Sequence, residues 1–573
     1  IAGVLLVFGY FVAHYSFADM FMAVVGLSVA AIPEGLPAVL TITLAVGVQA
    51  MARRNAIVRR LPAIETLGSV SVICTDKTGT LTRNEMTVVS VTTAATQYAV
   101  GGTGYEPMGD LAPAASAIPD ATSDTDAQGV LEAIGLAAVL CSDASLYEAK
   151  GTWKVAGDPM EGALLALSEK IGLDVARIRS TWNRIEVQPF DAKNRYMATL
   201  QQDDAQNRLL VVKGAPEKLL SMCRSQRRGC DGRTVVEDEM LDAAYWDEQA
   251  ERIAMQGQRV LGIAACRPLA DDERIDLDAE GHGLTFLGLL GMIDPPRPEA
   301  VAAIAECQSA GIIVKMITGD HKGTAAAIGH QIGMRDHDKV LTGAQIDAMS
   351  DASLAAAVLR TAIFARSSPE HKLRLVDALQ AHSMTVAMTG DGVNDAPALK
   401  KANVGIAMGR TGSEVTKEAA EIVLADDNFA SIVTAVREGR TVYDNFKKVI
   451  GWTLPTSFGE AVTIVVALLL GMTLPVTPVQ ILWINLVTVA TLGLALAFEP
   501  SEDNVMQRPP RPRHEPLLSK YLAWHIVLVS IVFLAGVFGI FAYMLDRGHS
   551  LELARTMAVN TLVAMEIFQL LFI

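Results

Sequence analysis

The sharpest chemical signal in this sequence is the heptapeptide DKTGTLT at residues 76–82, which follows the β-branched run 70–74. It places Asp76 at the end of an expected strand, with a glycine turn directly behind it. Backbone N–H groups of such a turn can approach a phosphate, and a carboxylate can attack a phosphate as a nucleophile. We therefore predict that Asp76 accepts a phosphoryl group. An aspartyl phosphate divides a hydrolysis into two steps, which gives a conformational machine time to change shape.

Three further polar clusters follow expected strands and carry the other groups that phosphoryl transfer needs. Asp391 can share Mg²⁺ with Asp76, because both offer carboxylate oxygens at strand ends. Lys372 offers a positive charge to the phosphoryl group, and Thr318 and Asp320 add a hydroxyl and a carboxylate. Any one of these residues alone is more typical of a helix cap or a turn. Together they predict one phosphoryl-transfer site.

The strands that must position these groups alternate with Ala-rich helical stretches. The β-branched runs lie at residues 70–74, 312–317, 362–365, 385–388 and 404–408. This βαβα pattern is typical of an open parallel sheet, in which ligands bind beyond the carboxyl ends of the strands. Residues 92–291 are richer in Gly, Asp and Gln and contain alternating strands, which indicates an inserted α+β domain.

The composition places part of the chain in a membrane. The 573 residues are 51% hydrophobic and only 19% charged, with a mean hydropathy of +0.31, whereas an average protein has roughly a quarter of its residues charged. The net charge of −15 disfavours nucleic acid as a partner, because phosphate backbones require a basic face. Six cysteines without a CxxC pair fit neither a disulfide framework nor a zinc or thiol-redox site.

Apolar stretches that approach the roughly 20 residues of a membrane span cluster at the two ends of the chain. They are residues 1–12, 20–50, 449–470, 476–498, 522–545 and 557–573. Lysines and arginines gather after the second stretch, before the third, and between the fourth and fifth, so we expect these flanks to be cytoplasmic. The head at 51–448 is then cytoplasmic, and the Ala- and Arg-rich usage favours a bacterial plasma membrane. Both chain ends lie within apolar runs, so we interpret the chain as a fragment.

Three acidic residues stand inside these apolar stretches, where a charge is costly and is typically functional. Glu34 lies between Pro33 and Pro37, and Glu460 and Glu566 are single acids in the third and sixth stretches. A proline removes a helical hydrogen bond, which predicts that the carbonyls of Val29 and Pro33 are free to face a cation. The broken helix and the three acids predict an ion site.

Five motifs of the head, in order, resemble those of the P-type ATPases. They are DKTGTLT at 76–82, KGAPE at 213–217, DPPR at 294–297, MITGDH at 316–321 and TGDGVNDAP at 389–397. The resemblance implies an ATP-hydrolysing transport protein that is phosphorylated on Asp76. The implied catalytic residues are Asp76, Lys77, Thr78, Thr318, Gly319, Asp320, Lys372, Asn394 and Asp395, with Mg²⁺ held by Asp76, the Thr78 carbonyl and Asp391.

The inserted domain resembles the nucleotide-binding domain of the same family. The resemblance implies that Phe190 stacks on adenine and that Lys213 and Gly214 line the pocket. Arg195 stands where relatives often have lysine. The full ATP-binding set that it implies is Glu161, Phe190, Arg195, Lys213, Gly214, Arg259, Thr318 and Asp320.

The implied fold is a multi-domain membrane protein: an α-helical transmembrane bundle plus an α/β haloacid-dehalogenase-like (Rossmann-like) phosphorylation domain with an inserted α+β nucleotide-binding domain. The expected bounds are 1–50 and 446–573 for the membrane helices, 69–91 with 292–440 for the phosphorylation domain, and 92–291 for the nucleotide-binding domain. In the family these helices are the third and fourth and the fifth to eighth. No Thr-Gly-Glu-Ser sequence occurs, so the actuator domain and the first two membrane helices are expected to precede Ile1.

The transported ion is inferred from the membrane motifs. PEGLP at 33–37 resembles the branch of calcium, sodium/potassium and proton-related pumps, and residues 482–488 and 564–566 resemble the sixth and eighth helices of calcium pumps. Oxygen ligands suit a hard cation. The implied ligands are Glu34, Glu460, Asn485, Thr488 and Glu566, with the carbonyls of Val29, Ala30 and Ile32.

Two departures leave the identity of the ion open. Val489 stands where calcium pumps have an Asp that bridges their ion sites, and Ser457 replaces an expected Asn. Calcium takes roughly six to eight oxygens, so the site holds one ion, has another geometry, or favours sodium, potassium or manganese. We rank Ca²⁺ first. A membrane-anchored phosphatase of the same fold and a lipid-flipping pump are the rival functions, and the acids in the membrane stretches argue against both. No obligate protein partner is evident.

Overall fold

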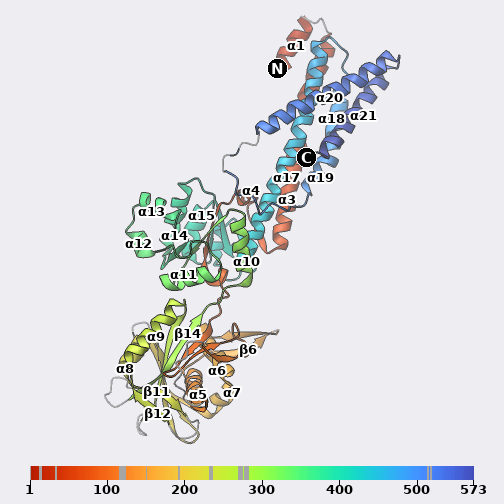
Figure 1. Ribbon diagram of the computed structural model, residues 1–573. Coiled ribbons are helices and arrows are strands. Elements are labelled where there is room, and N and C mark those ends of the chain that lie inside the picture. Colours follow the sequence, from red (N-terminus) through yellow and green to blue (C-terminus); the bar gives the residue numbers. More distant parts are fainter. Residues whose placement is uncertain are drawn as a thin grey trace. The chain divides into compact units, whose positions relative to one another are not determined.

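The computed structural model describes most of the chain (Figure 1). The described residues are 2–11, 16–32, 35–114, 124–149, 151–191, 194–230, 236–268, 275, 283–512, 515 and 519–573. They form two compact units, one of Ile1–Cys74, Glu306–Val314 and Val376–Ile573, the other of Thr75–Ala305 and Lys315–Leu375. The fold class predicted from the sequence is confirmed, because apolar helices, a parallel α/β sheet and a second α+β sheet are all present. The expected domain bounds stay a prediction.

An eight-stranded sheet contains the strands expected from the β-branched runs. Its order is β1-β20-β19-β18-β2-β15-β17-β16. The strands are β1 Ala56–Val58, β2 Val72–Asp76, β15 Ile313–Ile317, β16 Val340–Thr342, β17 Ile363–Ala365, β18 Val386–Gly390, β19 Val404–Met408 and β20 Ile422–Leu424. Strands β1 and β20 pair antiparallel. The pairs β15–β17, β16–β17, β18–β19, β18–β2 and β19–β20 are parallel. Parallel strands covered on both faces read as continuous apolar runs, which is why periodicity could locate them.

Short helices follow the strands of this sheet, as a βαβα pattern requires. They are α4 Pro62–Gly68, α10 Pro298–Ser309, α11 Lys322–Gln331, α12 Gly343–Asp347, α13 Asp351–Val358, α14 Pro369–Gln380, α15 Ala396–Lys401 and α16 Glu414–Ala419. Between β2 and the second sheet, Lys77–Leu81 form a turn in which Gly79 has a φ of 76°. Glycine adopts this backbone at little cost, and it leaves the turn tightly folded behind Asp76.

The second sheet is mostly antiparallel and lies wholly within residues 87–293. Its strands run in the order β5-β4-β3-β14-β13-β10-β9-β8, with β11 pairing β14 and β12. Their bounds are β3 Thr87–Thr92, β4 Gln97–Val100, β5 Leu111–Pro113, β8 Trp182–Asp191, β9 Tyr196–Asp203, β10 Arg208–Gly214, β11 Cys223–Cys230, β12 Val236–Met240, β13 Arg259–Cys266 and β14 Leu284–Ile293. This agrees with the inserted α+β domain expected there.

In the described part of that domain, five helices and one hairpin accompany the sheet. They are α5 Asp124–Leu140, α6 Pro159–Ile171, α7 Val175–Thr181, α8 Pro216–Met222, α9 Ala243–Met255 and the pair β6 Ser145–Ala149 with β7 Thr152–Ala156. Two apolar cores hold them to the sheet. One includes Ile134, Leu164 and Val211, and the other is built around Trp246 and Phe286, whose rings meet edge to face at 4.8 Å.

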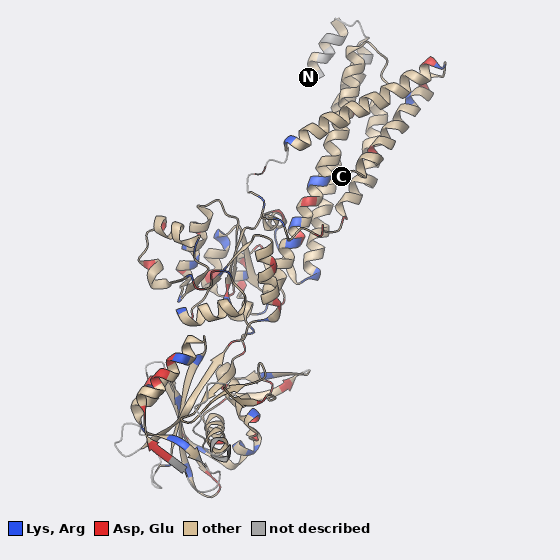
Figure 2. Cartoon of the chain, viewed as in Figure 1, with Lys and Arg blue, Asp and Glu red and all other residues tan. Residues whose placement is uncertain are grey.

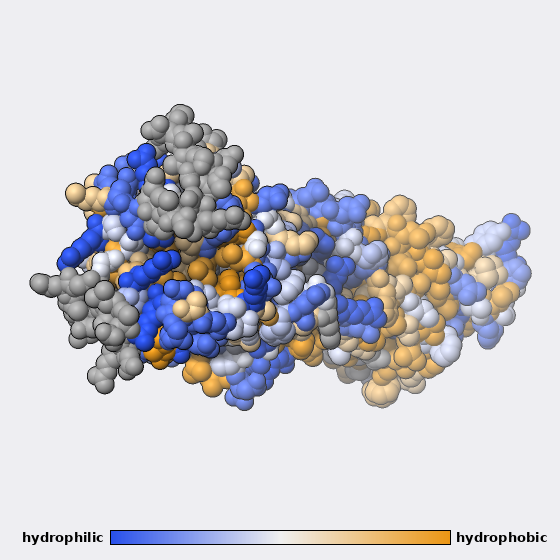
Figure 3. All heavy atoms as spheres, turned by 90° about the horizontal axis from the view of Figure 1, so that it is seen from below, coloured by the Kyte–Doolittle hydropathy of each residue, from blue (hydrophilic) through white to orange (hydrophobic). Residues whose placement is uncertain are grey.

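The remaining helices are largely apolar. They are α1 Ala2–Phe11, α2 Phe17–Ala31, α3 Leu36–Arg53, α17 Phe429–Leu469, α18 Pro478–Thr488, α19 Leu494–Ala497, α20 Lys520–Asp546 and α21 Leu551–Leu570. The exception is the first half of α17, which carries several charged residues. Charged residues are sparse along α18 and α20 (Figure 2). Hydrophobic side chains gather in a continuous area at the right of the space-filling view, the side on which these helices lie in Figure 1 (Figure 3).

Four spans among the described residues are long and apolar enough to cross a membrane. They are Leu36–Arg53, Phe429–Leu469, Pro478–Ala497 and Lys520–Asp546. These four helices overlap four of the six expected stretches, and the division into six spans stays a prediction. The run 20–50 is two helices, α2 and α3, and α21 starts earlier than expected and carries Glu552, Arg555 and Glu566, which lower its hydropathy.

Candidate phosphoryl-transfer and ion sites

Asp76 is the last residue of β2, and a lysine from a distant part of the sequence is bonded to it. Lys372 lies in the first turn of α14 and donates from Nζ to Asp76 Oδ2 at 2.6 Å. The lysine is buried, with 8% of its surface exposed. A buried cation beside a carboxylate favours the ionised form of that carboxylate. The contact places the charge of Lys372 at Asp76, and the catalytic role of Lys372 stays a prediction.

Two more of the predicted catalytic residues pair beside this contact. Lys77 is buried, and its Nζ lies 2.7 Å from Asp320 Oδ2. Thr318 accepts from the backbone N–H of Asp320 through its hydroxyl at 3.1 Å. The loop before α14 joins the same turn, since Arg366 and Ser367 donate their N–H groups to the carbonyls of Asp320 and Thr318 at 3.0 and 3.1 Å. One backbone network thus fixes the threonine, the aspartate and the start of α14.

The carboxyl ends of β2 and β18 bring three aspartates together. The two strands are parallel and pair Cys74 with Met388, so the residues that follow them leave the sheet at the same edge. One carboxylate oxygen each from Asp76, Asp391 and Asp395 lies within 4.8 Å of the others. Asp395 Oδ2 is held in place by the N–H groups of Asp391 and Gly392 at 3.3 and 3.2 Å. Three carboxylates around one point are a donor set that fits Mg²⁺.

The turn behind Asp76 is braced by two residues to which the sequence analysis assigned no role. Thr82 donates its hydroxyl to Asp294 Oδ2 at 2.5 Å, and Arg297 donates from Nε and Nη2 to the carbonyls of Thr82 and Gly79 at 2.9 and 3.1 Å. Burial raises the pKa of Asp294, although the hydrogen bond from Thr82 opposes this. Both residues belong to the DPPR motif, which was the signal available in the sequence.

A third residue to which the sequence analysis assigned no role is His371, the neighbour of Lys372. Its Nδ1 accepts from the N–H of Ser368 at 2.9 Å, and its Nε2 lies 2.7 Å from Asp347 Oδ1. Because Nδ1 accepts, the ring proton sits on Nε2 and is donated to the carboxylate. The histidine is 6% exposed and ties the start of α14 to α12. It therefore acts as a positioning residue for Lys372.

A cavity of about 210 Å³ adjoins this site within residues 75–375. Its lining includes Lys77, Thr78, Arg259, Asp294 and Asp320. Arg259 starts β13, so the cavity joins the catalytic turn to the second sheet. Two cations and two acids therefore line the cavity, and Lys77 is already paired with Asp320.

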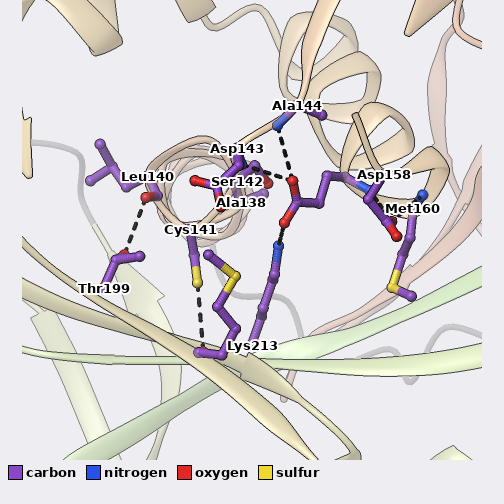
Figure 4. A network of polar contacts seen from close by, with 12 residues as sticks. Ala138, Leu140, Cys141, Ser142, Asp143, Ala144, Asp158, Met160, Thr199 and Lys213 are labelled. Carbon is purple, nitrogen blue, oxygen red and sulfur yellow. Dashed lines mark hydrogen bonds and ion pairs between the residues drawn. The ribbon is translucent and has the colours of Figure 1, made fainter. Parts of the chain in front are cut away.

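The second sheet contains a buried ion pair at the place predicted for the nucleotide. Lys213 Nζ lies 2.7 Å from Glu161 Oε1, and Glu161 Oε2 accepts from the N–H groups of Asp143 and Ala144 at 2.8 and 2.9 Å (Figure 4). Lys213 and Glu161 are 7% and 9% exposed. Nearby, burial raises the pKa of the Cys141 thiol to about 11, which keeps it protonated. The glutamate holds the lysine rather than leaving it free for a ligand.

The other predicted nucleotide residues lie on neighbouring strands. Phe190 on β8 is 62% exposed, as an aromatic platform for a base requires. Arg195 pairs with Glu217 at 2.8 Å on the surface, so its charge is already partly satisfied. Gly214 lies directly under the backbone of Arg195, since an added Cβ would meet the Arg195 carbonyl oxygen at 2.6 Å. Within the described contacts, the structure brings Glu161 and Lys213 together but not Phe190 and Arg259.

Two of the three predicted membrane acids are deeply buried among the apolar helices. Glu460 on α17 and Glu566 on α21 are 2% and 1% exposed. In the described part of the chain, both oxygens of Glu460 and one of Glu566 have no hydrogen-bond partner of good geometry. Asn485 is the polar neighbour of Glu460, and Thr488 is that of Glu566. Four of the predicted ligands thus converge on one buried point.

The remaining predicted ligands are placed less favourably. Glu34 and Pro33 lie outside the described residues. The carbonyl of Val29, expected to be free, accepts from the N–H of Ile32 at 3.3 Å, because the chain tightens at the end of α2 before leaving it. Ala30 is buried, while the Ile32 side chain is 56% exposed. The helix break itself is confirmed, since α2 ends at Ala31 and α3 starts at Leu36.

Val489, which stands in place of an acid, packs at the break between α2 and α3. It begins the π-helical turn Val489–Gly493, which continues the helix from α18 into α19. A Cβ added to Gly35 would lie only 2.0 Å from Val489 Cγ1, so the valine packs directly on the glycine. Ser457 on α17 is 8% exposed. A methyl group therefore occupies the region where a carboxylate would have supplied oxygen ligands.

Comparison with known proteins agrees with this geometry. Three family models match: "P-type ATPase, cytoplasmic domain N" at residues 130–299, "haloacid dehalogenase-like hydrolase" at 372–436, and "Cation transporting ATPase, C-terminus" at 473–573. The chain is 46% identical over 559 residues to a probable cation-transporting ATPase F of Mycobacterium tuberculosis, with 96% of this chain and 60% of that protein covered. The chain belongs to the P-type ATPases.

Two further relatives of this P-type ATPase support its place in the calcium-pump-like branch. A cation-transporting ATPase of Synechocystis is 46% identical, with 97% of this chain and 61% of that protein covered. A calcium-transporting ATPase of Bacillus subtilis is 41% identical, with 95% and 60% covered. The chain thus spans about three fifths of the length of the curated relatives that it matches.

Proposed function

We propose that this P-type ATPase chain supplies the phosphorylation, nucleotide and ion sites of an ATP-driven cation pump. The observation that carries the proposal is Asp76, bonded to Lys372 at 2.6 Å and grouped with Asp391 and Asp395 at one sheet edge. Asp76 attacks the terminal phosphorus of ATP, the bond to the bridging oxygen breaks, and ADP leaves. Lys372, Thr318 and Asn394 then face the phosphoryl oxygens.

Mg²⁺ fits the carboxylates at this edge, where Asp76, Asp391 and the Thr78 carbonyl would hold it. Bound there, it neutralises charge on the phosphate oxygens. Asp395 orients the residues around it through its bonds to the N–H groups of Asp391 and Gly392. Lys77 and Asp320 keep the catalytic turn in place beside the cavity that would take the polyphosphate.

The transported ion is proposed to be Ca²⁺, bound between Glu460 and Glu566 with Asn485 and Thr488. These residues supply hard oxygen ligands, which suit Ca²⁺. Val489 against Gly35 removes one acid from the region, which supports a single ion. Sodium, potassium or manganese are the alternatives. We place the pump in a bacterial plasma membrane with residues 51–448 on the cytoplasmic side.

The test is acid-stable phosphoenzyme formation from labelled ATP by the full-length gene product, titrated separately with Ca²⁺, Na⁺, K⁺ and Mn²⁺. Asp76→Asn should abolish the label. Glu460→Gln should remove the dependence on the ion, while Glu552→Gln, an exposed acid on α21, should leave it unchanged. Label that responds only to another ion would replace Ca²⁺ and keep the pump. Label without any ion dependence would favour a phosphatase, and no label would refute the mechanism.

A further inference from the structure

A basic cavity lies beside the polar half of α17, away from both sites described above. It has a volume of about 260 Å³ and is enclosed by α17, the end of α4 and the loop after α19. Its charged lining residues are Arg440, Lys447, Arg508, Arg511, Asp444 and Glu515. We call this cavity the basic pocket. Four cations face these two acids and Glu65, which pairs with Arg511 from outside the lining, so the wall keeps a net positive charge.

The positive charge of the wall is only partly neutralised. Lys447 pairs with Glu515 at 2.9 Å, Arg511 pairs with Glu65 at 3.6 Å, and Arg508 pairs with Asp444. Arg440, in contrast, is 7% exposed and donates only to the carbonyls of Val505, Arg508 and Ala310. No carboxylate forms an ion pair with Arg440 among the residues described. A buried guanidinium that meets only carbonyl oxygens keeps its full charge, and such a charge favours an anion nearby.

Two hydrogen-bond donors in the same wall have no partner. The Tyr443 ring has the Arg511 guanidinium 3.6 Å from its centroid and Lys447 Nζ at 5.3 Å. The Tyr443 hydroxyl and Arg511 Nε are buried and without a hydrogen bond in the described part of the chain. Tyr443 as a whole is 6% exposed. Leaving one such group unpaired costs about 1–3 kcal/mol, so two beside one cavity point to a ligand with acceptor oxygens.

We propose that the basic pocket binds a phosphate-bearing anion. Phosphate oxygens accept from the Tyr443 hydroxyl and from Arg511 Nε, and their charge offsets that of Arg440. Two sources have this chemistry. One is the head group of an anionic phospholipid, since α17 becomes apolar directly after Lys448. The other is soluble phosphate. The proposal does not depend on the ion that the pump carries or on phosphorylation of Asp76.

The experiment measures anion binding by the full-length protein with two probes. The first is inorganic phosphate, titrated calorimetrically in EDTA so that no Mg²⁺ supports phosphate at the aspartate site. The second is lipid retention in native mass spectrometry after reconstitution in phosphatidylcholine with added phosphatidylglycerol. Tyr443→Phe removes one hydroxyl and keeps the ring between Arg511 and Lys447. Its matched control is Tyr543→Phe on α20, where an arginine, Arg547, also lies over the ring, at 5.2 Å.

Tyr443→Phe should weaken binding of one probe about tenfold, the effect of losing one hydrogen bond to a charged group. Tyr543→Phe should change nothing. The probe that responds identifies the source. Arg511→Lys keeps the charge but loses the Nε donor, and it serves as the second variant if Tyr443→Phe fails to fold. Absence of binding to both probes in the wild type, or equal binding by the two tyrosine variants, would overturn the proposal and leave water as the occupant.

Discussion

The two groups of acids in this P-type ATPase differ in how fully they are partnered. At the sheet edge, Asp76 has Lys372, and Asp395 accepts from two backbone N–H groups. Among the apolar helices, three of the four carboxylate oxygens of Glu460 and Glu566 have no partner of good geometry in the described residues. Under the proposed function, the first group is organised before its substrate arrives, as electrostatic catalysis requires. Under the same proposal, a cation completes the coordination of the second group.

Removing Lys372 should produce the largest change. Lys372→Ala leaves Asp76 without its cation and removes a charge from the phosphoryl oxygens, so phosphoenzyme formation should slow by about a hundredfold or more. Lys401→Ala is the matched control, because that lysine forms an exposed pair with Asp377 and should change the rate less than twofold. Rapid-quench measurement with labelled ATP distinguishes them. Equal rates in the two variants would show that the sheet edge does not depend on this charge.

Changing one intramembrane acid should affect the ion and spare the nucleotide. Glu566→Gln keeps the shape of the side chain and removes one carboxylate ligand, so the half-saturating concentration of the activating cation should rise at least about tenfold. ATP binding without the ion should be unaltered. The comparison with Glu552→Gln, at the exposed start of the same helix, separates ligand loss from a general effect on α21. An unchanged ion dependence would place the site elsewhere.

The positioning role of His371 should give an intermediate effect. His371→Gln loses the bond to Asp347 while Lys372 remains, so phosphoenzyme formation should slow about tenfold, with little change in the ATP concentration for half-saturation. The separate variant Asp347→Asn keeps an oxygen that accepts from His371 Nε2, so it should retain most of the wild-type rate. His382→Gln, which changes an exposed histidine just after the end of α14, is the control. A loss of ATP affinity instead of rate would show that His371 only stabilises the fold.

The strands of the eight-stranded sheet and the polar residues at their carboxyl ends could be predicted from the sequence because both are local in character. Each buried parallel strand is an apolar run, and Asp76, Thr318 and Asp391 stand at or just after the ends of such runs, so periodicity and spacing sufficed to place them there. Their catalytic roles stay predictions. The bonds from Thr82 to Asp294 and from His371 to Asp347 join residues 212 and 24 positions apart. No local pattern encodes them, and they required coordinates.

The membrane region was predicted less completely, for a related reason. Apolar composition and the prolines locate the helices and the break between α2 and α3, but the direct packing of Val489 on Gly35 depends on how the helices pack. The hydrogen bond to the carbonyl of Val29 likewise follows from the local turn and not from the proline alone. Composition therefore predicted that acids are buried there, but not which oxygens remain free.

The smallest expected effect concerns Asp427, another acid whose carboxylate is held by several hydrogen-bond donors. Its carboxylate accepts from the N–H groups of Gly409, Arg410 and Thr411 and from the Thr411 hydroxyl, at 2.7 to 3.0 Å. Burial alone would raise the pKa of Asp427, but these hydrogen bonds outweigh it and lower the pKa below 3.8. The ionised form is therefore favoured in the folded state, and its contribution to stability is present above pH 3.8 and lost as the pH falls through the lower folded value.

Asp427→Asn should destabilise the protein by about 1–3 kcal/mol at pH 7, because an amide cannot accept all of these bonds. The difference in melting temperature from the wild type, a few degrees at pH 7, should shrink as the pH is lowered below 4, since the wild-type carboxylate then becomes protonated as well. Asp503→Asn, at an exposed position, should cause no such difference at either pH. A difference that stayed constant with pH would mean that the loss comes from packing and not from the charge. Asp427 would then belong with the apolar core rather than with the acids that backbone donors keep ionised.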